Sequence, residues 1–94
     1  MDYNDEKGWY DARIVPFANL SLHPASTVLH YGSEIFEGLK AYRRADGKVQ
    51  LFRPMENIRR MNRSAERLCL PEIPEDLAMQ VLTEFVKFEQ DWVP

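Results

Sequence analysis

The chain has 94 residues, of which 45% are hydrophobic and 29% are charged, and its formal net charge is −3. A chain of this length holds one domain at most, and so small a domain buries only part of its surface. No run of about 18 apolar residues is present, which excludes a membrane-spanning helix. The single cysteine, Cys69, excludes an internal disulfide framework and a cysteine-based zinc site. Because the acidic N-terminus has no signal-peptide pattern, we expect a cytoplasmic protein.

Charge is distributed unevenly along the chain. Between Lys40 and Arg67 there are nine Lys or Arg residues against three acidic residues, whereas the remainder holds three cations and twelve acids. The middle of the chain is therefore electropositive, which indicates a partner that carries negative charge.

The first third of the chain contains only weak signals. Residues 1–12 are expected to be irregular and solvated. The runs RIVPF and ANLSL predict one or two short strands around Pro16, at a sheet edge or at a break. The sequence His-Pro-Ala-Ser at residues 23–26 predicts a turn.

The stretch from residue 29 to residue 54 is the most informative part of the chain. Residues 34–43 are predicted to form a strand, and apolar residues on both of its faces favour a strand covered on both sides. Gly38 in its middle indicates a bulge or a close approach by backbone or ligand. Asp46-Gly47 is a strong hairpin signal, and the second strand is expected at residues 48–52.

Two amphipathic helices are predicted after this hairpin, at about residues 54–69 and 74–91. Pro54 and Pro74 each suit the start of a helix, where the missing N–H removes no helical hydrogen bond. Apolar residues then recur at spacings of three and four, which is typical of a helix with one buried face. The predicted fold class is therefore α+β: an antiparallel β-sheet with two helices packed on it.

A two-residue Asp46-Gly47 loop would place Lys40 directly opposite Arg53. Two facing cations repel, and Arg53 would also lie at the positive end of a helix. An anion would relieve this repulsion, and a phosphate held by a helix N-terminus and Arg53 is the best candidate. The alternative is a loop of three to five residues, which would shift the register and leave both cations pointing to water.

Other candidate residues carry weaker signals. His23 and His30 are too isolated for a metal site, and no metal site is predicted. Glu37 is unusual inside an apolar strand, and we expect its carboxylate to pair with one of the many arginines. Lys40 could in principle form a Schiff base, although nothing nearby in the sequence singles it out.

Two motif blocks resemble one enzyme family. The first is L-H-Y-G-x-x-x-F-E-G-L-K-A-Y at residues 29–42, and the second is L-F-R-P-x-x-N-x-x-R-M-x-R-S-A-x-R-L-C-L-P at residues 51–71. With N-L-S-L-H-P-A-S upstream and D-W-V-P at the end, they resemble the branched-chain amino acid aminotransferases. These are pyridoxal 5'-phosphate (PLP) enzymes of fold type IV, also called the D-amino-acid-aminotransferase-like fold.

The resemblance implies roles for individual residues. The arginine of L-F-R-P holds the PLP phosphate in this family, which implies a cofactor-binding role for Arg53. The tyrosine of L-H-Y-G and the phenylalanine of F-E-G line the apolar substrate pocket, which implies substrate binding by Tyr31 and Phe36. Gly38 would keep the strand close to the bound substrate, and Lys40 lies next to these residues.

The resemblance also implies a reaction and an architecture. The family transfers the amino group of Leu, Ile or Val to 2-oxoglutarate through PLP and forms homodimers. Its Schiff-base lysine lies in a later domain, and no segment here matches the surroundings of that lysine. Residues 1–94 are therefore expected to be part of the small N-terminal domain, with no catalytic residue of their own and no activity alone.

Two alternatives to this function stay open at this point. The first is another fold type IV enzyme, such as a D-amino acid aminotransferase or an aminodeoxychorismate lyase. These relatives share the Y-G-x-x-x-F/Y-E pattern but usually lack the longer motifs found here. The second is a small module whose basic middle binds nucleic acid. The acidic overall charge and the absence of a recognisable stacking motif argue against this alternative.

Overall fold

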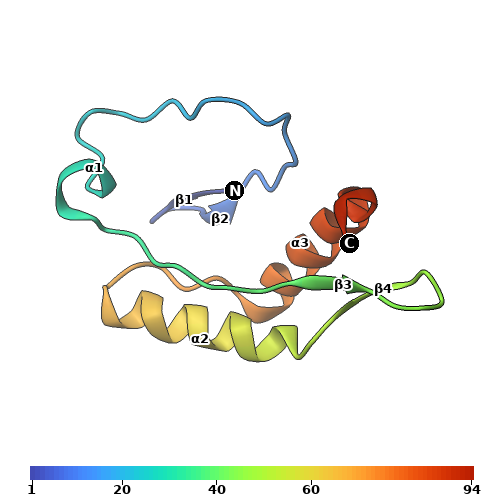
Figure 1. The fold of residues 1–94 in the computed structure, drawn as a ribbon. Coiled ribbons are helices and arrows are strands. Elements are labelled where there is room, and N and C mark those ends of the chain that lie inside the picture. Colours follow the sequence, from blue (N-terminus) through green and yellow to red (C-terminus); the bar gives the residue numbers. More distant parts are fainter.

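A computed structural model describes residues 1–94 as an α+β arrangement (Figure 1). Two antiparallel two-stranded sheets are formed, one by β1 (Asp2–Asn4) and β2 (Gly8–Tyr10) and one by β3 (Ala41–Arg43) and β4 (Val49–Leu51). The helices are α1 (Val28–Tyr31), α2 (Pro54–Arg67) and α3 (Glu75–Phe88), followed by a 3₁₀ turn at Gln90–Trp92. None of the helices has the length and apolarity needed to cross a bilayer.

The two long helices confirm the prediction, with ends that differ by a few residues. α2 begins at Pro54, as expected for proline in the first turn, and ends at Arg67. Its end is a Schellman motif: the amide of Leu70 donates to the carbonyl of Ala65 at 2.9 Å, and the amide of Cys69 donates to Glu66 at 3.1 Å. Cys69 takes the left-handed conformation with a φ of 53°, a place usually filled by glycine.

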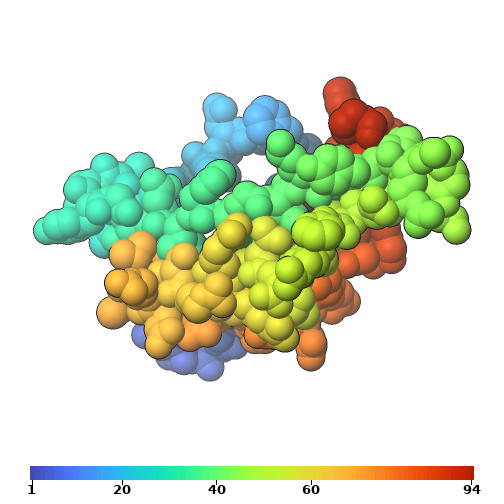
Figure 2. All heavy atoms as spheres, turned by 60° about the horizontal axis from the view of Figure 1, so that its bottom comes forward, coloured from blue at the N-terminus to red at the C-terminus, as the bar shows by residue number.

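The core lies between α2 and α3. Ile58, Ala65 and Ala78 are the three buried residues, and they come from the facing sides of these helices. Residues 33–41 pass along α2 (Figures 1 and 2) with a strict alternation: odd-numbered residues are half-buried and even-numbered residues from 34 to 40 are exposed. This segment therefore has one face toward the helices and one open face.

The predicted strand at residues 34–43 is wrong in length and in its environment. Only Ala41–Arg43 pairs with another strand, and residues 35–40 make no backbone–backbone hydrogen bond. The face that carries Phe36 is open, with Phe36 itself 91% exposed, so the segment is covered on one side and not on two. The second strand is shorter than predicted as well, at Val49–Leu51.

The N-terminal residues form a hairpin, and the prediction that residues 1–12 are irregular is wrong. Tyr3 pairs with Trp9 across β1 and β2, and their rings meet edge to face at 5.3 Å. The indole nitrogen of Trp9 donates to the carbonyl of Glu72 at 2.7 Å, which fastens the hairpin to the α2–α3 connection.

The next segment has no strand, so the predicted strands around Pro16 are absent. Residues 11–25 are all exposed and form a loop that arcs away from the helices (Figures 1 and 2). The turn predicted at residues 23–26 is confirmed by a 2.9 Å hydrogen bond from the amide of Ser26 to the carbonyl of His23. The short helix α1 follows it and was not predicted.

Candidate ligand-binding site

The register of the β3–β4 hairpin differs from the predicted one by one residue. Ala41 pairs with Leu51 and Arg43 with Val49, and the amide of Arg44 donates to the carbonyl of Lys48 at 2.8 Å. The loop therefore contains three residues, Ala45-Asp46-Gly47, with Gly47 left-handed at a φ of 80°. A three-residue loop with a left-handed last residue is a common hairpin type.

This register removes the predicted pairing of Lys40 with Arg53. The alternative of a longer loop is confirmed, and continuation of the observed register would place Lys40 beside Phe52. A shift of one residue changes the face on which each side chain of a strand lies. The electrostatic argument for an anion between Lys40 and Arg53 is therefore wrong, and the role of Arg53 rests on the family resemblance.

The even-numbered face of residues 36–42 lines an open hollow of about 600 Å³. We call it the aromatic hollow; its lining residues are Phe36, Gly38, Leu39, Lys40, Tyr42, Phe52 and Asn57. Three of the five predicted site residues, Phe36, Gly38 and Lys40, are thus brought together. The walls are aromatic, and Lys40 is the one cation among them, which suits a ligand with an apolar part and an anionic group.

Gly38 leaves open space in this hollow. A Cβ atom built on Gly38 would meet the Phe36 ring at 3.9 Å, an ordinary contact distance, and the backbone at Gly38 is not left-handed. Neither strain nor crowding within the chain therefore requires glycine here. The predicted reason for glycine, a close approach by a ligand, stays a prediction.

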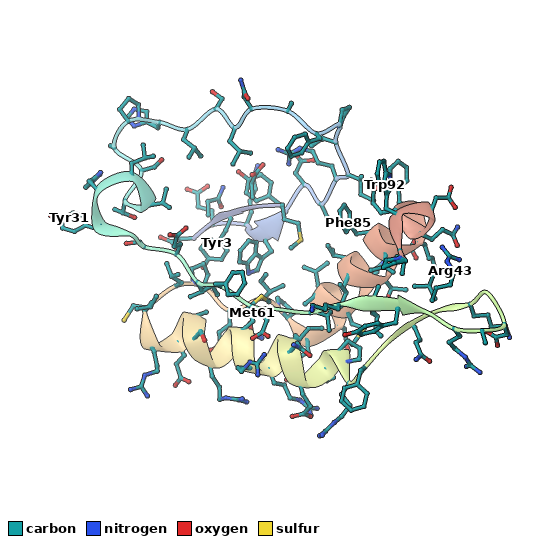
Figure 3. The ribbon with its side chains drawn as sticks, in the orientation of Figure 1. Tyr3, Tyr31, Arg43, Met61, Phe85 and Trp92 are labelled. Atoms are coloured by element: carbon teal, nitrogen blue, oxygen red, sulfur yellow. The ribbon has the colours of Figure 1, made fainter.

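Tyr31 and Arg53 lie outside the lining of the aromatic hollow. Tyr31 ends α1, is 79% exposed and points away from the other elements (Figure 3). Arg53 precedes α2 in a left-handed conformation, with a φ of 47° and no side-chain hydrogen bond to the helix end. The structure therefore splits the predicted site: three residues share one hollow and two stand apart.

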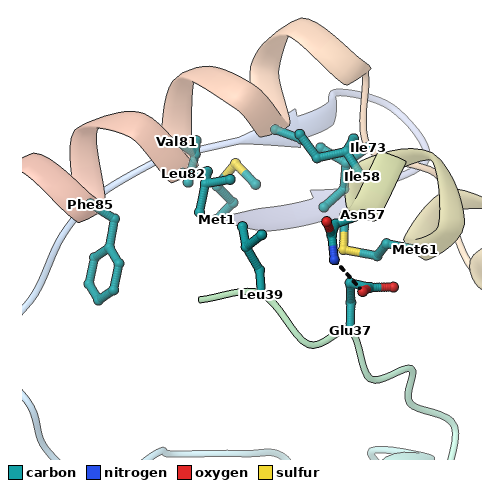
Figure 4. A pocket seen from close by; sticks show the side chains of 11 residues that line it. Met1, Glu37, Leu39, Asn57, Ile58, Met61, Ile73, Val81, Leu82 and Phe85 are labelled. Atoms are coloured by element: carbon teal, nitrogen blue, oxygen red, sulfur yellow. Dashed lines mark hydrogen bonds between the residues drawn. The ribbon is translucent and has the colours of Figure 1, made fainter. Parts of the chain in front are cut away.

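Glu37 lies on the opposite face of the same segment and contacts α2. Arg60 holds its carboxylate with two hydrogen bonds, one from Nε to Oε2 at 2.8 Å and one from Nη2 to Oε1. Asn57 donates to the same Oε1 at 2.9 Å (Figure 4). The Arg60 guanidinium, followed by the Asn57 amide, lowers the pKa of Glu37 to about 2 against the opposing effect of burial. The prediction that Glu37 pairs with an arginine is confirmed.

An apolar cavity of about 310 Å³ lies beneath this segment, between α2 and α3 (Figure 4). Leu39 points into it from the segment, and Ile58, Met61, Val81 and Leu82 face it from the helices. Asn57 lines both this cavity and the aromatic hollow, so it stands at the boundary between the packed side and the open side.

The basic middle of the chain is partly neutralised by contacts within the fold. Arg60 binds Glu37, Arg59 binds Glu56 and Glu75, and Arg44 binds Asp46. Arg43 is used in hydrogen bonds to carbonyl oxygens near the chain end. Several arginines are therefore engaged within the fold, which weakens the case for a nucleic-acid surface. No cluster of three or more His, Cys, Asp or Glu side chains is arranged to bind a metal ion.

Comparison with known proteins gives relatives along the whole chain. Branched-chain-amino-acid transaminase 1 of Bacillus subtilis is 54% identical over 94 residues, and branched-chain-amino-acid aminotransferase 2 of the same organism is 50% identical. The mitochondrial branched-chain-amino-acid aminotransferase of Bos taurus is 49% identical over 94 residues. No protein-family model matches the chain.

These relatives confirm the resemblance to branched-chain aminotransferases that the motifs indicate. The three alignments include 100% of this chain, and the chain spans about a quarter of the length of the relatives it matches, 26%, 26% and 24%. The homology therefore covers every element of the fold described above and only one part of each relative.

Proposed function

We propose that these 94 residues are part of a PLP-dependent transaminase that moves the amino group of Leu, Ile or Val to 2-oxoglutarate. The observation that carries the proposal is the identity of 46–54% to branched-chain aminotransferases along the whole chain. The aromatic hollow supports it, because aromatic walls suit a branched aliphatic side chain at about 0.8 kcal/mol per buried CH₂.

We propose Phe36 and Gly38 as substrate contacts, since both line the aromatic hollow. Lys40 lies in the same hollow, where its ammonium group suits a carboxylate or a phosphate. Tyr31 as a second pocket wall and Arg53 as the phosphate ligand are proposed from the resemblance. Arg53 fits this role chemically, because its guanidinium has no ion-pair partner in the fold and it precedes the N-terminus of α2.

PLP, when bound, supplies the electron sink for transfer of the amino group. Residues 1–94 would contribute substrate contacts and a phosphate contact, as part of a small N-terminal domain. The Schiff-base lysine is proposed to come from a later domain, so that these residues alone would be inactive. A homodimer is proposed from the resemblance, and a cytoplasmic location is proposed from the single cysteine of the chain.

The experiment uses the full-length protein that carries this sequence. Purified protein is incubated with PLP, 2-oxoglutarate and one amino acid at a time, and glutamate is measured. We expect glutamate from L-Leu, L-Ile and L-Val, and none from D-Ala. Turnover of D-Ala alone would assign the protein to another fold type IV activity. Glutamate formed by residues 1–94 alone would overturn the proposal that the essential lysine lies elsewhere.

A further inference from the structure

The backbone of residues 35–40 is held by hydrogen bonds at Gly38. The amide of Gly38 donates to Oε1 of Glu37 at 3.1 Å, and its carbonyl accepts from Nδ2 of Asn57 at 2.8 Å. The remaining peptide groups of this stretch make no hydrogen bond to another part of the backbone. The peptide groups on both sides of one glycine are therefore held by two side chains, one of which comes from α2.

These side chains are themselves fixed. The Glu37 side chain is 12% exposed, and its carboxylate accepts from Gly38, from Asn57 and from the Arg60 guanidinium, which binds both of its oxygens. A two-point guanidinium–carboxylate contact fixes orientation as well as distance. We call Glu37, Asn57 and Arg60 the clasp.

Glu37 lies on the face opposite the aromatic hollow, and Asn57 stands at the boundary between the two faces. Because burial alternates along residues 33–41, the direction of Glu37 also sets the directions of Phe36 and Gly38. A slide or twist of the segment by one residue would exchange its two faces. Fastening Glu37 to α2 is therefore a way to keep Phe36, Gly38 and Lys40 on the side of the hollow.

We propose that the clasp is a positioning device for substrate binding: Glu37, Asn57 and Arg60 hold residues 36–40 so that the hollow presents Phe36, Gly38 and Lys40 to the amino-acid substrate. This inference rests on the proposed function. None of its three members needs to touch the reacting atoms. Their effect is on affinity and on discrimination among aliphatic side chains.

The main test compares three variants of the full-length protein. Glu37→Gln keeps the size of the side chain and removes the charge that Arg60 binds, and Asn57→Ala removes the hydrogen bond to the Gly38 carbonyl. The matched control is Arg59→Gln, which removes ion pairs from Arg59 on α2 to Glu56 on α2 and to Glu75 on α3 without touching the segment. KM for L-Leu and kcat are measured for each variant.

We expect the two clasp variants to raise KM for L-Leu at least about tenfold with a smaller change in kcat, since misplaced contacts weaken binding steeply. The control should stay within about twofold of the wild type. A role in stability alone would lower the melting temperature and the active fraction and leave KM unchanged. That pattern in both clasp variants would overturn the inference. If one of the two clasp variants fails to fold, the KM of the other tests the inference.

Amide hydrogen exchange provides a readout that does not depend on activity. In the protein without substrate, the amide of Gly38, which donates to Glu37, should exchange faster in both clasp variants than in Arg59→Gln. Unchanged exchange would overturn the inference even in an active enzyme. If the wild type does not act on branched-chain amino acids but exchange rises as expected, the proposed function fails and the positioning of the segment by the clasp stands.

Discussion

The guanidinium of Arg43 donates from Nη2 to the carbonyl oxygen of Gln90 at 2.5 Å, across 47 positions of sequence. Its Nε donates to the carbonyl of Val93 at 3.2 Å and its Nη1 to that of Gly47 at 3.0 Å. One side chain on β3 therefore ties the β3–β4 hairpin to the 3₁₀ turn that follows α3 and to Val93 after it, and Figure 3 shows Arg43 between β3 and the end of the chain. Hydrogen bonds donated by a charged group are stronger than those between neutral groups.

Replacing Arg43 with Ala should lower the free energy of unfolding by about 1.5–3 kcal/mol, because hydrogen bonds to a charged group are lost together. Urea unfolding of the full-length protein measures this change in the free energy of unfolding, through the shift in the urea concentration at the midpoint. The control is Arg44→Ala, which removes an exposed 3.4 Å ion pair to Asp46 and should change stability by at most about 1 kcal/mol. Equal effects of the two substitutions would contradict the role of Arg43.

The left-handed backbone at Cys69 gives a second stability prediction. An L-residue in this conformation carries a cost of roughly 1–2 kcal/mol that glycine avoids, and part of this gain is offset by the greater freedom of glycine in the unfolded chain. Cys69→Gly should therefore raise the free energy of unfolding by about 0.5–1 kcal/mol. Cys69→Ala removes the same thiol but keeps the strain, so a gain of equal size in Cys69→Ala would contradict the explanation.

The long helices and the hairpin could be predicted because their signals are local. Pro54, Pro74 and the apolar spacing mark the two helices. The prediction placed the end of α2 at residue 69 because nothing in the sequence shows that Cys69 turns left-handed. Asp46-Gly47 marked the hairpin correctly but not its register, since a left-handed Gly47 serves both a two-residue and a three-residue loop.

The remaining features depend on contacts between distant parts of the chain. An arginine partner for Glu37 was predicted, but the choice of Arg60 is made by the packing of residues 33–41 on α2. The N-terminal hairpin was missed because its anchor, the carbonyl of Glu72, lies far along the chain. Part of the proposed site could be predicted, because Phe36, Gly38 and Lys40 lie on one face of a single extended segment. The positions of Tyr31 and Arg53 could not, because they depend on where α1 and α2 lie.

The pKa of Glu37 predicts a specific loss of stability in acid. Arg60, and then Asn57, lower the pKa of this carboxyl to about 2, below its ordinary value of 4.5. A depressed folded-state pKa means that the ionised carboxylate contributes its full stabilisation above about pH 4.5 and loses it as the pH falls towards 2. The urea concentration at the unfolding midpoint of the wild type should therefore decrease as the pH is lowered from about 4.5 towards 2.

The Glu37→Gln variant tests the source of this pH dependence. Because glutamine does not titrate, the variant should be less stable than the wild type at pH 7, and the difference should shrink as the pH falls towards 2. Glu84→Gln removes an exposed carboxylate that pairs with Lys87 and should leave the pH dependence of the wild type in place. A stability difference between Glu37→Gln and the wild type that stays constant with pH would rule out this carboxylate as the titrating group.

The phosphate role of Arg53 needs a control cation that does not itself hold the fold together, and this excludes Arg43, which binds carbonyl oxygens of Gln90 and Val93. Arg63 is a better match, since it is exposed on α2 and makes no ion pair. In the full-length protein, Arg53→Ala should weaken PLP binding by roughly 10- to 100-fold, the effect expected for losing a charge-assisted contact of about 1.5–3 kcal/mol. Arg63→Ala should leave PLP affinity within about twofold of the wild type. Fluorescence titration of each apoprotein with PLP measures the dissociation constant of PLP. Equal PLP affinities for the two variants would contradict the role of Arg53 as the phosphate ligand.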